Sequence, residues 1–160
     1  MIPPKPIRVL LIDNEPDFLE ALSFWLTSHQ YEVKAVTDGR QGVALIQREP
    51  FDVVFLDVVM PQMDGLEVLR RIRAFNKTLP VILVTASPGD ENRFAGARSL
   101  GISGFFPKAD SLEQLSEMLE VALRMIRRSS DSPATPAASS LPRGVDAIRD
   151  FFTRLISRTR

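Results

Sequence analysis

The amino-acid sequence predicts an α/β protein built on a doubly wound, five-stranded parallel sheet. Short apolar runs alternate with helical patterns five times over residues 1–128, which is typical of repeated strand–helix units. The runs are rich in Val, Ile and Leu and several are apolar on both faces, as strands are when helices cover both sides of a parallel sheet. Polar residues directly follow several of the runs, at the sheet edge where such folds bind ligands.

Five apolar segments are expected to form the strands: IRVLLI (7–12), YEVKAV (31–36), FDVVFL (51–56), PVILVTA (80–86) and SGFFP (103–107). The first, third and fourth segments are nearly continuous in apolar residues, which favours strands that are buried on both faces. The second alternates between apolar and polar residues, as a half-exposed strand does. The fifth is a short strand.

Five intervening segments are expected to be helices: 16–29, 38–49, 64–75, 91–101 and 110–128. Apolar residues recur at helical spacing in the first, third and fifth. The first begins with Pro16, which suits the first helical position, and the second with Asp38, a candidate cap. The fourth ends at Gly101. The fifth is long and amphipathic, with Glu113 in a capping-box position.

Composition excludes several classes of protein. The chain of 160 residues is 44% hydrophobic, which is enough to bury a core, and it contains no cysteine for disulfides or thiol chemistry. No segment approaches the ~20 apolar residues of a membrane span, and MIPPKPIRVL does not have the features of a secretion signal. The formal net charge is zero, which argues against nucleic-acid binding by these residues. We therefore expect a cytoplasmic protein without a membrane or nucleic-acid partner.

The chain is expected to have three parts. Residues 1–128 form one domain. Residues 129–143 are rich in Ser, Pro and Ala without periodicity, which indicates a flexible linker. Residues 144–160 have apolar residues at helical spacing, which predicts an amphipathic tail helix.

The residues that follow the strands form a candidate phosphoryl-transfer site. Asp13, Asn14 and Asp57 offer oxygen ligands of the kind that Mg²⁺ prefers. Lys108 can pair with anionic oxygens, and the hydroxyl of Thr85 can bind a phosphoryl oxygen. An aspartate held by Mg²⁺ and lysine is suited to attack phosphorus and form an acyl phosphate.

The segments LLIDNEPDFLEAL, VVFLDVVMPQMDGLEVLRRIR, PVILVTA and GFFPKADSLEQL resemble, in order and spacing, the receiver domains of bacterial two-component response regulators. The resemblance covers residues 7–127. It implies a flavodoxin-like (βα)5 fold with strand order 2-1-3-4-5. It also implies that Asp57 accepts phosphate from a phosphohistidine on a sensor kinase or phosphotransfer protein. Such a domain catalyses only its own phosphorylation and dephosphorylation.

The resemblance also assigns the other site residues. The metal ligands would be Asp13, Asn14, Asp57 and the backbone carbonyl of Val59. Lys108 would be the phosphate partner. The switch residues would be the hydroxyl residue Thr85 and the aromatic residue Phe105.

Two residues depart from the family's pattern. Asn14 stands where the family usually has a second acid that touches Mg²⁺, so a neutral amide replaces an anion. Ala109 follows the lysine where the family usually has proline. We expect Asn14 to weaken the metal site without abolishing it, because Mg²⁺ accepts neutral oxygen or water as a ligand.

Other functions stay open beside a phosphorylation-controlled switch. An aspartyl phosphatase is disfavoured, because such enzymes need an acid where this chain has Val59. A pseudo-receiver would bind partners without phosphorylation. The chain could also be the N-terminal part of a DNA-binding response regulator, since PKADSLEQL resembles receivers with such an output domain. The downstream protein partner is unknown. Dimers could form through the tail helix or through the face made by residues 91–101, 103–107 and 110–128.

Overall fold

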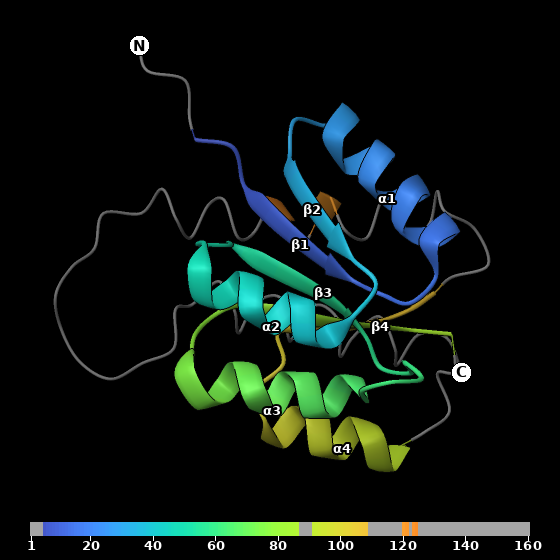
Figure 1. The fold of residues 1–160 in the computed structure, drawn as a ribbon, viewed down its shortest axis with the longest axis vertical. Coiled ribbons are helices and arrows are strands. Elements are labelled where there is room, and N and C mark those ends of the chain that lie inside the picture. Colours follow the sequence, from blue (N-terminus) through green and yellow to red (C-terminus); the bar gives the residue numbers. More distant parts are fainter. Residues whose placement is uncertain (1–4, 87–90, 109–119, 122, 125–160) are drawn as a thin grey trace, which may run out of the picture.

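The computed structural model describes residues 5–86, 91–108, 120, 121, 123 and 124. Within this part, five strands form one sheet in the order β2-β1-β3-β4-β5, and all neighbouring strands are parallel (Figure 1). The predicted fold class and strand order are therefore confirmed. The strands are β1 (Arg8–Ile12), β2 (Glu32–Val36), β3 (Val53–Asp57), β4 (Val81–Thr85) and β5 (Gly104–Pro107).

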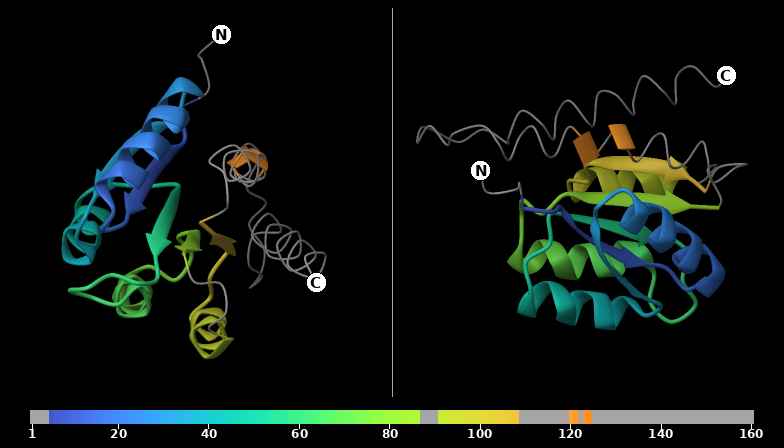
Figure 2. Two further views of the ribbon diagram at one scale, coloured as in Figure 1. Left: turned by 90° about the vertical axis from the view of Figure 1, so that its right-hand side faces the viewer. Right: turned by 90° about the horizontal axis from the view of Figure 1, so that it is seen from above.

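Helices cover both faces of the sheet. Within the described residues, the helices that can be followed from end to end are α1 (Pro16–Ser28), α2 (Gly39–Arg48), α3 (Gly65–Phe75) and α4 (Glu91–Ser99). Helix α1 lies on one face, and α2, α3 and α4 lie on the other, as Figures 1 and 2 show. The described residues of the segment 120–124 are helical and lie on the same side as α1 (Figure 2). This arrangement is a doubly wound sheet.

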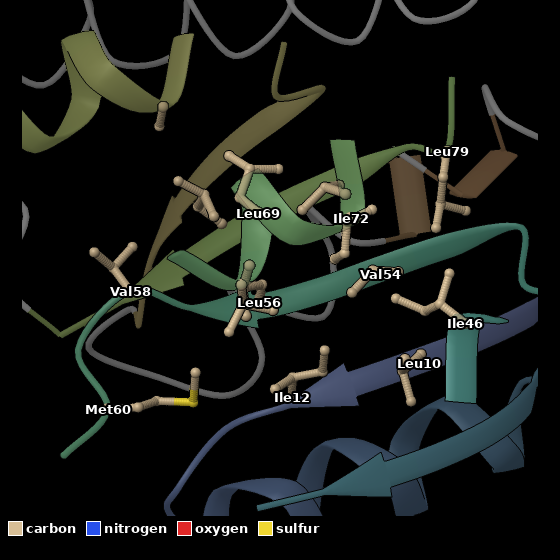
Figure 3. Packing of buried hydrophobic residues seen from close by; sticks show 14 of the residues in the cluster. Leu10, Ile12, Ile46, Val54, Leu56, Val58, Met60, Leu69, Ile72 and Leu79 are labelled. Atoms are coloured by element: carbon tan, nitrogen blue, oxygen red, sulfur yellow. The ribbon is translucent and has the colours of Figure 1, made fainter. Parts of the chain in front are cut away.

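Two hydrophobic cores hold the layers together. The first joins β1, β3 and β4 to Leu19, Leu22 and Leu26 of α1, and it includes Leu123 of the fifth helical segment. The second joins the opposite face of the sheet to α2, α3 and α4, as Figure 3 shows in part. Every residue of β3 and β4 is buried. Since burial of one large apolar side chain contributes roughly 1.5–3 kcal/mol, these central strands are the most strongly fixed part of the sheet.

Side-chain caps set the starts of two helices that leave the site edge of the sheet. Asp38 accepts a hydrogen bond from the backbone N–H of Arg40 at 2.7 Å, so the predicted cap is confirmed. Asp64 accepts from the N–H of Leu66 at 2.8 Å at the start of α3. Each cap satisfies one of the backbone donors that a helix start leaves unpaired.

The strands and helices with defined bounds begin and end within two residues of the prediction, and two of the differences have a clear cause. Strand β3 includes Asp57, because this residue still pairs with Val84 in the register of β3 and β4. Helix α4 ends at Ser99 instead of residue 101. The cause is Gly101, whose φ of 79° is a left-handed conformation that stops a helix.

A buried arginine ties α3 to the turn after α4. Arg73 donates hydrogen bonds to the carbonyls of Leu100 at 3.0 Å, Gly101 at 2.8 Å and Asn76 at 3.1 Å. These carbonyls follow the ends of the two helices, where backbone acceptors lack partners within the helix. Burial lowers the pKa of Arg73 below its usual value. The contacts hold α4 in place beside α3.

Only a small part of the segments predicted after residue 108 falls within the residues that the structure describes. Four described residues of the expected helix 110–128 are helical. The linker at 129–143 and the tail helix at 144–160 lie outside the described residues. Among the residues that the structure describes, no helix has the length and apolar character that a bilayer crossing requires.

The close approach of α3 to the end of β3 predicts a sensitive glycine. A Cβ on Gly65 would lie 2.2 Å from the carbonyl oxygen of Asp57 and 2.8 Å from the Cα of Val58. Since both neighbours are backbone atoms, Gly65→Ala must displace the chain and should cost about 2 kcal/mol or more in the free energy of unfolding, measured by urea titration.

The matched control is Gly96→Ala in α4. Among the described residues, a Cβ there meets only Leu66 Cδ1 at 3.8 Å, so the change should be neutral or stabilise by up to about 1 kcal/mol. Equal effects of the two substitutions would contradict the packing of α3 against β3.

Candidate functional site

Four predicted site residues come together at the carboxyl ends of the strands. Asp13 follows β1, Asp57 ends β3, Thr85 ends β4 and Lys108 follows β5. The exposed fractions are 3% for Asp13, 3% for Asp57 and 1% for Thr85. Because the strands are parallel, their carboxyl ends lie at one edge, where the side chains of Asp13 and Asp57 meet that of Lys108.

Lys108 is the cationic centre of this pocket. Its ammonium nitrogen lies 2.7 Å from Asp13 Oδ2, 2.6 Å from Glu15 Oε1 and 3.4 Å from Asp57 Oδ2. It also lies 4.7 Å from the ring centroid of Phe18, in a cation–π contact. Burial alone would lower the pKa of Lys108, but its close contacts with the carboxylates of Asp13 and Glu15 and the charges of Asp13 and Asp57 outweigh that effect. The net result is a raised pKa, so the lysine stays charged.

The charge of Asp57 is not fully compensated. Burial raises the pKa of Asp57, and the neighbouring charge of Asp13 raises it further. The N–H of Val59, which donates to Asp57 Oδ1 at 3.1 Å, and the ammonium of Lys108 offset only part of this effect. Three carboxylates therefore share one ammonium group in a mostly buried pocket.

This donor set fits a hard divalent cation. Carboxylate oxygens of Asp13, Glu15 and Asp57 lie within 4.8 Å of one another. Among the described residues, no donor meets the buried Asp13 Oδ2 in hydrogen-bond geometry, although Lys108 lies close enough for an ion pair. Clustered oxygens with excess negative charge are the ligands that Mg²⁺ and Ca²⁺ prefer.

Asn14 also faces the pocket. When its amide nitrogen points inward, it donates to Asp57 Oδ2 at 3.1 Å and to the carbonyl oxygen of Val59 at 3.2 Å. The hydrogen-bond pattern selects this orientation, because the opposite one brings the amide oxygen against two acceptors. A cavity of about 360 Å³ opens beside Asn14, between the β2–α2 and β3–α3 connections.

The remaining predicted residues lie at the rim and behind it. The carbonyl of Thr85 accepts a hydrogen bond from the backbone N–H of Lys108 at 2.6 Å, which fixes the ends of β4 and β5 side by side. Phe105 is half-buried and packs edge-on against Phe94 of α4, with ring centroids 4.1 Å apart. The described contacts of Phe105 are thus with α4 and the second core, and its predicted switch role stays a prediction.

Sequence reasoning missed two contacts of the site. Glu15 is exposed, and its carboxylate pairs directly with Lys108. The ring of Phe18 in α1 also contacts the ammonium. The position of Glu15, two residues after Asp13, was the available signal. No sequence pattern identifies a cation–π pair formed across the fold.

The fold and the pocket together define a doubly wound α/β domain with an acidic site at the carboxyl ends of its parallel strands. A family model described as "Response regulator receiver domain" matches residues 9–120. The chain therefore belongs to the receiver-domain family of two-component response regulators, and the resemblance drawn from its motifs is confirmed.

Similar proteins come from several bacteria. "Response regulator MprA" of Mycobacterium sp. (strain KMS) is 35% identical over 150 residues, which are 93% of this chain and 64% of that protein. "Probable transcriptional regulatory protein TcrX" of Mycobacterium tuberculosis is 37% identical over 120 residues, 75% of this chain and 51% of that protein. The chain thus spans about half to two-thirds of the length of these curated relatives. The solved structure of response regulator TrrA from Thermotoga maritima in complex with Mg(2+)-BeF is 28% identical, with a TM-score of 0.63 over 72% of this chain and 97% of that one.

The raised pKa of Asp57 predicts how stability depends on pH. The folded protein binds this proton more tightly than the unfolded chain, so stability is lost as pH rises from about 3.9 through the raised pKa. With a chelator present, Asp57→Asn should stabilise the protein at pH 7 by on the order of 1 kcal/mol, or about 2–4 °C in Tm. The gain should vanish below about pH 3, where the carboxyl is protonated in both the folded and the unfolded state.

The control is Glu20→Gln on the exposed side of α1, which should change stability by less than about 0.5 kcal/mol. A loss of stability on Asp57→Asn, or a gain that does not depend on pH, would contradict the uncompensated charge.

Proposed function

We propose that this protein is a phosphorylation-controlled signalling switch that accepts a phosphoryl group on Asp57. The donor would be a phosphohistidine on a sensor kinase or a phosphotransfer protein. One observation carries the proposal: Asp57 is held at the end of a fully buried strand, next to a charged lysine and a second carboxylate. Membership of the receiver-domain family supports it.

The chemistry follows from the carboxylate. An oxygen of Asp57 attacks phosphorus, a phosphorus–oxygen bond forms, and the phosphorus–nitrogen bond to the donor histidine breaks. The electron pair of the broken bond stays on the imidazole, which leaves neutral when its other nitrogen carries a proton. Lys108 is within reach of Asp57 and pairs with the oxygens of the transferred group. The hydroxyl of Thr85 binds one of those oxygens.

A divalent cation, Mg²⁺ in this proposal, neutralises charge between carboxylate and phosphate when it is bound. Asp13, Asp57, Asn14 and the carbonyl of Val59 would hold it. The clustered carboxylate oxygens of Asp13, Glu15 and Asp57 support a cation at this place, and the solved Mg(2+)-BeF complex of the similar TrrA protein supports Mg²⁺ as that cation. Self-catalysed loss of the phosphoryl group by water attack belongs to the same proposal.

The signal would leave through protein contacts. Phe105 packs on α4 through Phe94, so a change at Thr85 and Lys108 can reach α4 through β5. A second candidate is that these residues are the N-terminal part of a DNA-binding regulator. The greater length of the two relatives and the words "transcriptional regulatory" in the name of one of them favour it.

The phosphoacceptor assignment is tested by intact-mass spectrometry after treatment with acetyl phosphate and Mg²⁺. The unmodified protein should gain one phosphoryl group, and Asp57→Asn should gain none, because an amide is not a nucleophile toward phosphorus. Asp17→Asn, an exposed change in the first turn of α1, is the matched control and should label like the unmodified protein. Labelling of Asp57→Asn at the unmodified level would refute the assignment, and no labelling of any form would favour the pseudo-receiver.

The proposed domain organisation predicts a role for residues 144–160. An isolated helix of about 15 residues is marginal in water, so this segment should be helical only when docked on the domain, on a second copy or on a partner. A chain that ends at residue 130 should therefore differ in scattering mass or partner binding. The full-length double substitution Phe151→Ser and Phe152→Ser should reproduce the effect by removing apolar contacts without changing length. Unchanged behaviour of both would show that the tail is inert.

A further inference from the structure

The side-chain amide of Asn14 occupies the position between two oxygens that a cation would share. It lies against Asp57 Oδ2 and the carbonyl oxygen of Val59, at 3.1 Å and 3.2 Å. With nitrogen inward, the amide donates one hydrogen to each oxygen. With oxygen inward, three oxygens converge on the same spot. The two orientations therefore suit two different states of one pocket.

The metal-free pocket favours the donating orientation. Asp57 is buried, and its remaining hydrogen-bond partners are the N–H of Val59 and a long contact to Lys108. A neutral NH₂ group that lies against both Asp57 Oδ2 and the Val59 carbonyl oxygen supplies one hydrogen to each of these two acceptors. An aspartate in this position could not do so, because an ionised carboxylate only accepts hydrogen bonds.

We propose that Asn14 is a two-position gate for the metal site: its amide nitrogen holds Asp57 and Val59 in the metal-free protein, and the amide turns over to present its oxygen when a divalent cation binds. This inference rests on the proposed function for the identity of the cation. It makes Asn14 a competitor of the cation as well as a ligand. The affinity for Mg²⁺ is then set by two opposing contributions from one side chain.

Substitution of Asn14 by alanine should have a different effect on Mg²⁺ affinity if the side chain is a gate than if it is only a metal ligand. Asn14→Ala removes the competing donor together with the ligand oxygen, and water can replace a neutral oxygen ligand of Mg²⁺. The Mg²⁺ affinity of Asn14→Ala should therefore stay within about threefold of the unmodified protein. Its Tm in chelator should fall, because Asp57 and the carbonyl of Val59 lose their shared donor.

Asn14→Asp also removes the hydrogen-bond donor of the metal-free state, but it strengthens the oxygen ligand of the metal-bound state. It removes the donor and adds an anion, so Tm in chelator should fall at least as far as in Asn14→Ala. Mg²⁺ should bind about tenfold to a hundredfold more tightly, because an anionic oxygen replaces a neutral one. The rise in Tm on adding Mg²⁺ should be largest for this variant.

The experiment is isothermal titration calorimetry with Mg²⁺, paired with thermal unfolding in chelator and in Mg²⁺, on the full chain without phosphoryl donor. Gln62→Ala is the matched control, because this amide lines the same cavity without a described contact to Asp57, and it should change neither quantity. The proposal is overturned if Asn14→Ala weakens Mg²⁺ binding tenfold or more while its Tm in chelator is unchanged, which is the result for a ligand alone. It is also overturned if neither the unmodified protein nor Asn14→Asp binds Mg²⁺. Phosphorylation of Asp57 is measured separately, so failure of the gate and failure of the phosphoacceptor role are distinguishable.

Discussion

The ion-pair cluster around Lys108 is the interaction on which the site depends. One ammonium group contacts Asp13, Glu15 and Asp57, which come from two different strand ends. The two aspartates are almost fully buried, so water screens their repulsion poorly. The pocket therefore carries excess negative charge, and a bound divalent cation would neutralise it. A phosphoryl group on Asp57 would in turn give Lys108 a new anionic partner.

The fold sustains this unfavourable cluster by surrounding it with strong packing. Strands β3 and β4 are buried along their whole length and contribute to two separate cores. The register fixes Asp57 beside Val84, and Gly65 lets α3 start against the carbonyl of Asp57. Buried like charges lower the stability of the folded state. The site persists because the tight packing around it prevents the backbone from moving the carboxylates apart.

The sequence predicted the fold and the principal site residues for a physical reason. Parallel strands bring their carboxyl ends to one edge, so residues that follow separate apolar runs must meet, and Asp13, Asp57 and Lys108 do so. The cap at Asp38 was predictable because capping depends on local chain geometry. The early end of α4 was not predicted, because the positive φ of Gly101 is a choice between conformations that glycine adopts equally well.

The contacts that individual side chains make at the site could not be predicted from the sequence. The pairing of Glu15 with Lys108 and the inward amide of Asn14 depend on rotamers and on neighbours from other elements, which periodicity does not encode. The same holds for the edge-on contact of Phe105 with Phe94. Residue type placed these side chains near the pocket, and only the assembled sheet determined what each of them touches.

The central claim is that Asp57 carries an uncompensated charge in a pocket without bound cation. The most direct measurement follows the side-chain carboxyl carbon of Asp57 by NMR through a pH titration in chelator, in the unmodified protein and in Asp13→Asn. The account predicts that Asp57 has a pKa above the ordinary aspartate value of about 3.9 and that Asp13→Asn lowers it, because a like charge is removed. A pKa of Asp57 at or below the ordinary value, unaffected by Asp13→Asn, would contradict the account.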